Sequence, residues 1–192
     1  IEAANQLKGT KVVAVDLAGA EALHPSSYYA NIFNKAKEYR LNITIHAGEA
    51  TGSDEVMMAM DNGAMRIGHG VHLSLDKETV KRVKEERICF EFCPTSNLQT
   101  KSLKRYEDVP LRKFIELGIP VTINSDNMTV SNTNVPIELS HMVKTFALTK
   151  DEVNYLLLQS IAHAFIEDED KKEILRRMLS IKIDEFYERI SK

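Results

Sequence analysis

Three polar motifs in the chain carry side chains that can bind a metal ion or move protons. His46 and Glu49 are separated by an Ala-Gly pair, His69 stands between two glycines, and Asp126 follows a run of β-branched residues. Imidazole and carboxylate groups are zinc ligands, and both act as general acids or bases. If the fold brings them together, the reaction class they favour is metal-assisted hydrolysis, in which a metal lowers the pKa of a water molecule.

Each motif also has a purely structural interpretation. His46 can be a hydrogen-bonded core histidine beside a solvated Glu49, and a histidine between glycines, such as His69, is more often a turn residue. Asp126 can cap a following helix. The remaining histidines have no neighbours at an informative spacing, and we expect them to be surface or packing residues: His24, His72, His141 and His163.

The elements that must position these motifs alternate between strands and helices. Short apolar runs rich in β-branched residues predict strands at residues 12–15, 43–45, 65–67, 88–92 and 120–123. Helical spacing of apolar residues predicts helices at residues 28–40, 54–62, 77–86 and 111–117. Near-continuous apolar strands joined by helices indicate a parallel sheet covered by helices.

The polar clusters all follow predicted strands, and this favours a barrel over a doubly wound sheet. In a (β/α)8 barrel the loops after successive strands converge on one mouth, whereas a doubly wound sheet binds its ligand at one switch point. By strand alternation His46 shares a face with Thr44, while Ile43 and Ile45 share the other. We therefore predict an α/β fold of the TIM-barrel type, in which five parallel strands are followed by C-terminal helices in a single domain over residues 1–192.

The last third of the chain is predicted to be helical. Thr149 and Glu152 have the spacing of a capping box. Residues 168–190 form one long amphipathic segment. Its predicted apolar face consists of Ile174, Leu175, Met178, Leu179, Ile183 and Phe186.

Composition excludes several classes of partner. A formal net charge of −3 over 192 residues gives no general attraction for nucleic acid or anionic lipid. No apolar run is long enough to span a bilayer, and the start of the chain does not resemble a signal peptide. Cys89 and Cys93 are the only cysteines and are predicted to be free thiols of a cytoplasmic protein. A small neutral ligand fits these properties.

Taken together, the motifs resemble the second half of the adenosine deaminase family. The strings are Val-Asp-Leu-Ala-Gly at 15–19, His-Ala-Gly-Glu at 46–49, Gly-His-Gly at 68–70, Cys-Pro-Thr-Ser-Asn at 93–97 and Ser-Asp-Asn at 125–127. Their order and spacing are far more specific than any one of them. The resemblance extends from about Val12 to the C-terminal helix, and it implies a zinc-dependent deaminase barrel that acts on a purine nucleoside.

The resemblance also implies a role for each residue. His46 and Asp126 would be zinc ligands, Glu49 would protonate the purine at N1, and His69 would orient the attacking water and accept its proton. Asp126 would also hold that water. Gly19 would donate its backbone N–H to the purine N3. Many members of the family have an aspartate that contacts N7 where this chain has Asn127.

One expected part of the family's site is absent from the sequence. The resemblance implies a His-x-His pair of zinc ligands on the first strand, and no such pair occurs here; the first residue is Ile1. We therefore expect the chain to correspond to the last five strands of an eight-stranded barrel and to pair with itself or with a missing N-terminal segment. Two alternatives remain open: a fragment that is inactive alone, and a deaminase of adenine or a modified adenosine.

Overall fold

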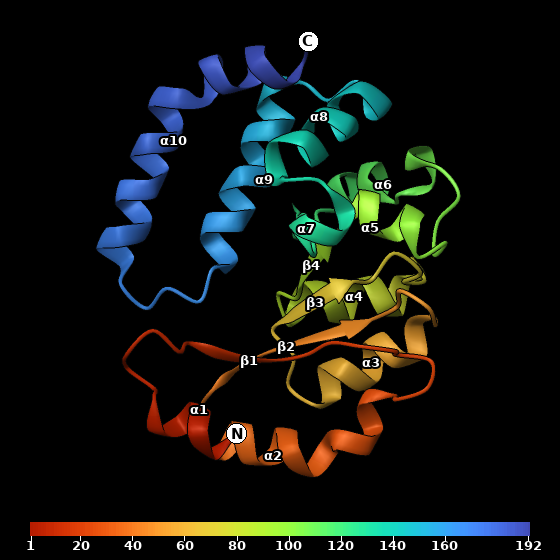
Figure 1. The fold of residues 1–192 in the computed structure, drawn as a ribbon, viewed down its shortest axis with the longest axis vertical. Coiled ribbons are helices and arrows are strands. Elements are labelled where there is room, and N and C mark those ends of the chain that lie inside the picture. The colour runs from red at the N-terminus through yellow and green to blue at the C-terminus, as the bar shows by residue number, and fades with distance from the viewer. The chain divides into compact units, whose positions relative to one another are not determined.

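The computed structural model describes all residues from 1 to 192 and contains one sheet of five strands (Figure 1). The strands are β1 (Ala14–Leu17), β2 (Asn42–Ala47), β3 (Arg66–His69), β4 (Cys89–Phe92) and β5 (Val121–Ile123). They follow one another in the sheet in the order of the sequence, and β1–β2 and β2–β3 are parallel pairs. The predicted α/β fold with five successive strands is confirmed.

Helices connect the strands and form the last third of the chain. They are α1 (Glu2–Gln6), η1 (Ser26–Tyr29), α2 (Ala30–Glu38), α3 (Ser53–Asp61), α4 (Lys77–Glu85), α5 (Pro94–Gln99), η2 (Tyr106–Asp108), α6 (Leu111–Leu117), α7 (Met128–Ser131), α8 (Val135–Phe146), α9 (Lys150–His163) and α10 (Glu169–Ile190). None of them is both long and apolar enough to cross a membrane.

The chain divides into two compact units, Ile1–Phe90 and Glu91–Lys192, and the boundary falls within β4. The assignment of residues 1–192 to a single domain stays a prediction.

In the first unit, apolar residues of β2 face the helices. Ile43 and Ile45 are almost completely buried, and α2 and α3 both contact β2. Phe33 of α2 and Val56 of α3 are buried as well. His46, in contrast, keeps 22% of its side chain exposed. The alternation predicted from the sequence therefore holds on β2.

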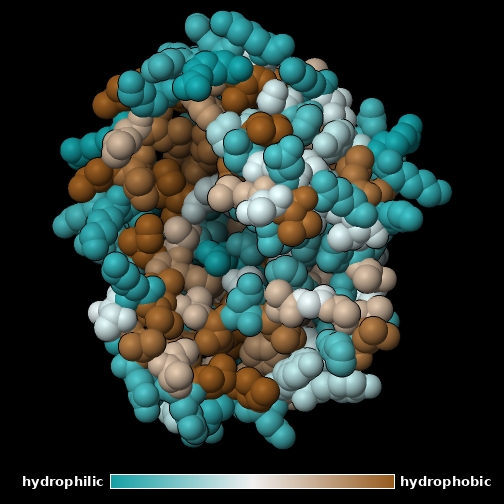
Figure 2. All heavy atoms as spheres, viewed as in Figure 1, coloured by the Kyte–Doolittle hydropathy of each residue, from teal (hydrophilic) through white to brown (hydrophobic).

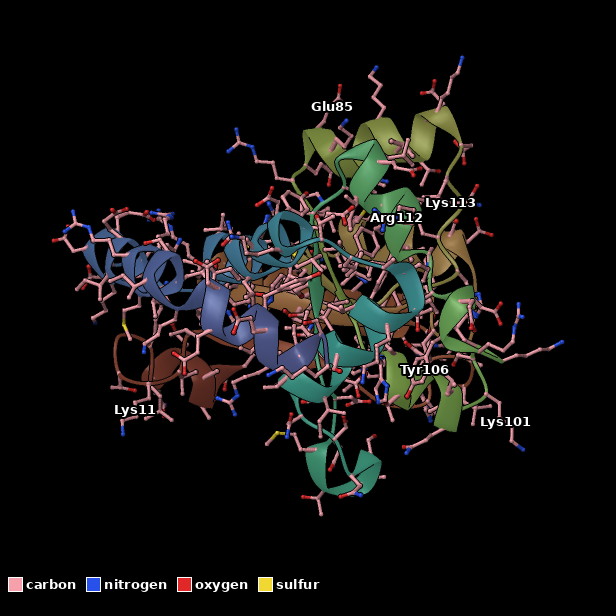
Figure 3. The ribbon with its side chains drawn as sticks, turned by 90° about the horizontal axis from the view of Figure 1, so that it is seen from above. Lys11, Glu85, Lys101, Tyr106, Arg112 and Lys113 are labelled. Carbon is pink, nitrogen blue, oxygen red and sulfur yellow. The ribbon has the colours of Figure 1, made fainter.

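In the second unit, a cluster of aromatic and aliphatic side chains packs around β5. The rings of Phe92 and Phe114 meet edge to face with centroids 4.9 Å apart, a favoured aromatic geometry. Helix α9 lies against β5, and α10 packs on α8 and α9. Arg112 of α6, which Figure 3 labels, donates to the carbonyl of Phe146 at 2.8 Å and to Glu152. These hydrogen bonds connect α6 to the end of α8 and the start of α9.

Most predicted elements occur, with shifted ends. The first strand is Ala14–Leu17, two residues later than predicted, and Val12 makes only an isolated bridge with Lys8. The helix predicted at 28–40 begins as a 3₁₀ turn and ends at Glu38. The helix at 111–117 has the predicted bounds.

The C-terminal helices are partly as predicted. The capping box is confirmed, because Thr149 and Glu152 each bond the other's backbone N–H. The long helix begins at Glu169 with Asp168 as its cap. Its predicted apolar face is wrong in part: Ile174 and Met178 are each 57% exposed, whereas Ile183 is buried. Figure 2 shows apolar residues in brown at the surface among hydrophilic ones.

Candidate functional site

Neighbouring strands bring His46 and His69 together at the carboxyl end of the sheet. His46 lies in β2, and His69 is the last residue of β3. In the parallel register His46 pairs with Gly68, and Ala47 pairs with His69. A Cβ atom on Gly68 would lie 2.6 Å from Cδ2 of His46, well inside normal carbon contact. The first glycine of the Gly-His-Gly motif therefore makes room for the neighbouring imidazole.

The side chains of Asp16, His46, Glu49 and His69 form one cluster in the first unit. The rings of His46 and His69 meet edge to face, with centroids 4.9 Å apart. Glu49 Oε2 lies 3.6 Å from His69 Nε2, and Asp16 Oδ2 lies 3.9 Å from His46 Nε2. These distances exceed those of direct hydrogen bonds. Each contact is an ion pair only when its imidazole is protonated.

Burial differs between the two members of the Glu49–His69 pair. The His69 side chain is 2% exposed, and that of Glu49 is 16% exposed. Water has little access to the imidazole, so its charge interaction with the carboxylate is weakly screened. Such a pair can hold and transfer a proton next to a ligand.

The backbone at two site residues adopts the left-handed region, which is unusual for residues with a side chain. Seven residues other than glycine have positive φ, and five of them follow the ends of helices: Arg40, Arg87, Lys101, Asn132 and Ala147. The other two are His69, with φ of 63°, and Asp126, with φ of 52°. His69 ends β3, and Asp126 follows β5. Backbone strain of this kind is concentrated at functional sites.

In the second unit, Asp126 and Asn127 lie in the loop after β5. The Ser96 hydroxyl donates to Asp126 Oδ2 at 2.6 Å and so fixes the carboxylate. Asn127 caps α7, because its Oδ1 accepts from the N–H groups of Thr129 and Val130 at 3.1 and 3.0 Å. The cap uses only the carbonyl oxygen of the amide. Both site residues are exposed.

The cysteine beside this loop, Cys93, is buried and favours the protonated thiol. Burial raises the pKa of the Cys93 thiol far above its ordinary value, and the nearby carboxylates of Asp126, Glu91 and Glu138 raise it further. Only the thiolate binds metal or attacks a substrate. Cys89 is also buried and forms no disulfide bond, as predicted.

A pocket in the first unit adjoins His46. It is lined by Leu17, Ala18, Gly19, Ala20, Glu21, His24, Tyr29 and His46. Gly19 has φ of +140°, and a Cβ atom there would meet nothing within 4 Å. Its backbone is thus open toward the pocket, which is what close approach of a planar ligand requires.

The sequence of the chain matches a known family. The family model for adenosine deaminase matches residues 1–181 of the chain. The chain belongs to the adenosine deaminase family. Adenosine deaminase from Haemophilus ducreyi is 46% identical over 165 residues, which are 85% of this chain and 48% of that protein.

Solved structures of two other deaminases have the same fold. Adenine deaminase from Arthrobacter aurescens superposes with a TM-score of 0.86 at 26% identity, over 95% of this chain and 57% of that one. N6-methyl-AMP deaminase from Arabidopsis thaliana superposes with a TM-score of 0.82 at 28% identity, over 93% of this chain and 52% of that one. The chain therefore spans about half the length of its relatives, and the predicted barrel class is confirmed.

Two residues for which the sequence predicts no role in the site line the pocket. His24 is exposed, as predicted, and also lines the pocket. Glu21 lines it as well, and the sequence signal for it is a carboxylate two residues after Gly19 in a loop that follows a strand. His141 is a packing residue, as predicted, and its ring stacks on that of Tyr106, which Figure 3 labels, with centroids 4.7 Å apart.

The residues of the chain do not by themselves fit a complete zinc site. No three or more His, Cys, Asp or Glu side chains form a group that could hold a metal ion, and a catalytic zinc normally has three protein ligands. His46 and Asp126, the two ligands implied by the resemblance, belong to different compact units.

Proposed function

We propose that this chain carries the catalytic part of a hydrolase that converts adenosine, or a close 6-aminopurine nucleoside, to its inosine-type product and ammonia. The observation that carries the proposal is the Glu49–His69 pair, 3.6 Å apart and largely buried. The pair lies next to His46, which lines a pocket together with Gly19. The proposed substrate is a neutral purine nucleoside, which suits a chain of low net charge.

The proposed chemistry divides proton transfer between the two side chains. Glu49 donates a proton to N1 of the purine, which makes C6 more electrophilic. His69 takes a proton from the water that attacks C6. The new C–O bond forms, and His69 passes the proton it took to the exocyclic nitrogen. The bond between C6 and that nitrogen then breaks, ammonia leaves, and the C6 hydroxyl becomes a carbonyl as its proton returns to Glu49. General acid and base groups of this kind each contribute about 10²–10⁴ in rate.

The remaining residues orient the substrate and the water. Gly19 donates its N–H to N3, and the amide N–H₂ of Asn127 donates to N7, since its oxygen already caps α7. Asp126 holds the attacking water. The family resemblance implies that His46 and Asp126 would be zinc ligands. A bound zinc would supply a Lewis acid. The further ligands are not assigned to this chain.

Adenosine is proposed over two other substrates because of sequence similarity. The relative named adenosine deaminase is 46% identical, whereas the adenine deaminase and the N6-methyl-AMP deaminase are 26% and 28% identical. The second candidate function is that of a subunit or segment that is catalytic only with a partner, since the chain spans about half of its relatives. Self-association or pairing with another segment belongs to that proposal.

Ammonia release by the purified chain tests these proposals. The chain is incubated with adenosine, adenine or N6-methyl-AMP, with zinc added or with a chelator. Where the chain turns over, alone or completed by the rest of the barrel, we expect the highest kcat/KM with adenosine and a loss of at least about 10²-fold in Glu49→Gln. Glu78→Gln is the matched control, because Glu78 is an exposed residue in the first turn of α4.

The outcomes separate the candidates. If adenine or N6-methyl-AMP is turned over faster than adenosine, that compound is the substrate. No ammonia from any of the three with zinc present, by a chain shown to be folded, favours the second candidate. Equal rates for Glu49→Gln and Glu78→Gln would remove Glu49 from the mechanism.

A further inference from the structure

A single buried carboxylate holds the loop that follows β2. Glu21 is 7% exposed. Its Oε1 accepts from the N–H of Gly48 at 2.6 Å, and its Oε2 accepts from the N–H groups of Glu49 and Ala50 at 2.9 Å each. The hydroxyl of Thr51 also donates to Oε1. Four consecutive residues of the loop therefore bind one side chain.

The backbone of residues 48–51 has the shape of an anion-binding site, and the Glu21 carboxylate of the same chain occupies it. Successive backbone N–H groups around a left-handed residue form a concave nest for an anion. Gly48 is that residue, with φ of +71°, and a Cβ atom there would lie 2.8 Å from Val56 Cγ2. The loop can therefore adopt this conformation only with glycine at position 48, and only an acceptor at its centre satisfies the three N–H groups.

The hydrogen bonds leave Glu21 little capacity for other chemistry. A carboxylate has about four acceptor positions, and four donors approach this one. Although Glu21 lines the pocket, its oxygens are directed to the loop. It is therefore suited to positioning rather than to proton transfer with a ligand.

Glu49 is the residue that this arrangement affects most directly. Its N–H is bonded to Glu21, and the N–H groups on both sides are bonded as well. The direction of the Cα–Cβ bond of Glu49 is thereby fixed, and the side chain reaches to 3.6 Å from His69 Nε2. A charged acceptor gives stronger hydrogen bonds than a neutral one.

We propose that Glu21 is a positioning residue that holds Glu49 against His69 through the backbone of residues 48–51. The consequence for catalysis rests on the proposed function, in which Glu49 is the proton donor. The positioning itself does not, since it concerns only contacts within the first unit. The inference is therefore tested at two levels.

The first level measures loop order in the purified chain by NMR. In Glu21→Gln one acceptor oxygen becomes an N–H₂ group that faces donors, so the amides of Gly48, Glu49 and Ala50 should exchange with solvent at least about tenfold faster. Nuclear Overhauser contacts between the Glu49 side chain and the His69 ring should weaken. Glu55→Gln is the matched control, since Glu55 Oε1 also accepts a backbone N–H, from Ser26 at 2.5 Å.

A milder variant covers the case in which Glu21→Gln does not fold. Thr51→Val removes one of the four donors and keeps the carboxylate with its three N–H partners. We expect a smaller increase in exchange at residues 48–50 and a folded chain. Exchange rates at these amides equal to those of the unmodified chain in either variant would overturn the proposal. So would faster exchange with undiminished Glu49–His69 contacts.

The second level measures deamination. Glu21→Gln should lower kcat by about 10- to 100-fold and leave KM within about threefold, because the pocket remains while the proton donor is misplaced. Glu55→Gln should leave both unchanged. A loss confined to KM would overturn the positioning of the acid. If the unmodified chain releases no ammonia, the proposed function fails, whereas the positioning of Glu49 is still decided by the NMR measurements.

Discussion

Replacing Gly70 with alanine should destabilise the first unit through two separable effects. The residue lies directly after β3 with φ of +66°. A Cβ atom there would lie 2.3 Å from Cδ1 and 2.6 Å from Cε1 of Phe90, and 3.3 Å from Ile67 Cγ2. Normal carbon contacts are about 3.5–4.0 Å. Phe90 is completely buried, so its ring cannot move aside into solvent.

The expected loss of stability combines a backbone cost and a packing cost. Alanine in the left-handed region costs about 1–2 kcal/mol, and overpacking a core by one methyl group costs about 1–3 kcal/mol. Alanine also restricts the unfolded chain more than glycine does, and this offsets about 0.4–1 kcal/mol of the cost. We therefore expect Gly70→Ala to lower the free energy of unfolding by roughly 2–4 kcal/mol. With a slope of about 2 kcal/mol per molar urea, the midpoint falls by roughly 1–2 M.

Urea titration of the purified chain, followed by circular dichroism, measures this shift. Gly9→Ala is the control for the backbone term, because Gly9 has φ of +83° and nothing within 4 Å of an added Cβ atom. Its midpoint should fall by about 0.8 M at most. If Gly70→Ala shifts the midpoint no further than Gly9→Ala does, the contact with Phe90 does not constrain the strand end as the structure implies.

Two further substitutions probe a helix cap and a buried charge. The N–H and hydroxyl of Thr79 and the hydroxyl of Ser74 lower the pKa of Asp76 to about 2, so its stabilising contribution should be present above about pH 4 and lost as the pH falls through 2. Asp76→Asn, which keeps the cap, should remove that contribution to the pH dependence of the urea midpoint. A urea midpoint that depends on acid pH in the same way as in the unmodified chain would contradict this. Glu138 is fully buried and accepts from the Thr95 N–H at 3.0 Å and the Thr133 hydroxyl at 2.5 Å. Glu138→Ala should cost about 2–4 kcal/mol by urea titration, since both donors lose their acceptor, and a loss below about 1 kcal/mol would show that water replaces the carboxylate.

The sequence was most informative where local patterns decide the structure. Ile43 and Ile45 alternate with His46 on one short strand, so the period of two fixes which face each occupies. Thr149 and Glu152 cap a helix through contacts within one turn. The cluster of His46, Glu49 and His69 follows from the parallel register of successive strands, which the βα alternation predicts.

Contacts between distant loops were not predictable in this way. Glu21 and the residues it binds are 27 to 30 positions apart, and no spacing rule relates the two loops. The exposure of Ile174 and Met178 on α10 also escaped prediction. Amphipathic spacing shows that a helix has an apolar face, but it does not show whether another element covers that face.

Buried carboxylates, rather than apolar side chains, support the loops that carry the proposed chemistry in both units. Glu21 accepts from the loop after β2, and Glu138 accepts from the N-terminus of α5, one residue before Ser96. Loops after parallel strands leave N–H groups that no neighbouring strand pairs, and an apolar core cannot satisfy them. A carboxylate can, because it accepts several hydrogen bonds at fixed angles. The order of these loops therefore depends on a few charged contacts, so substitutions at Glu21 should disturb Glu49 more than the core beneath it.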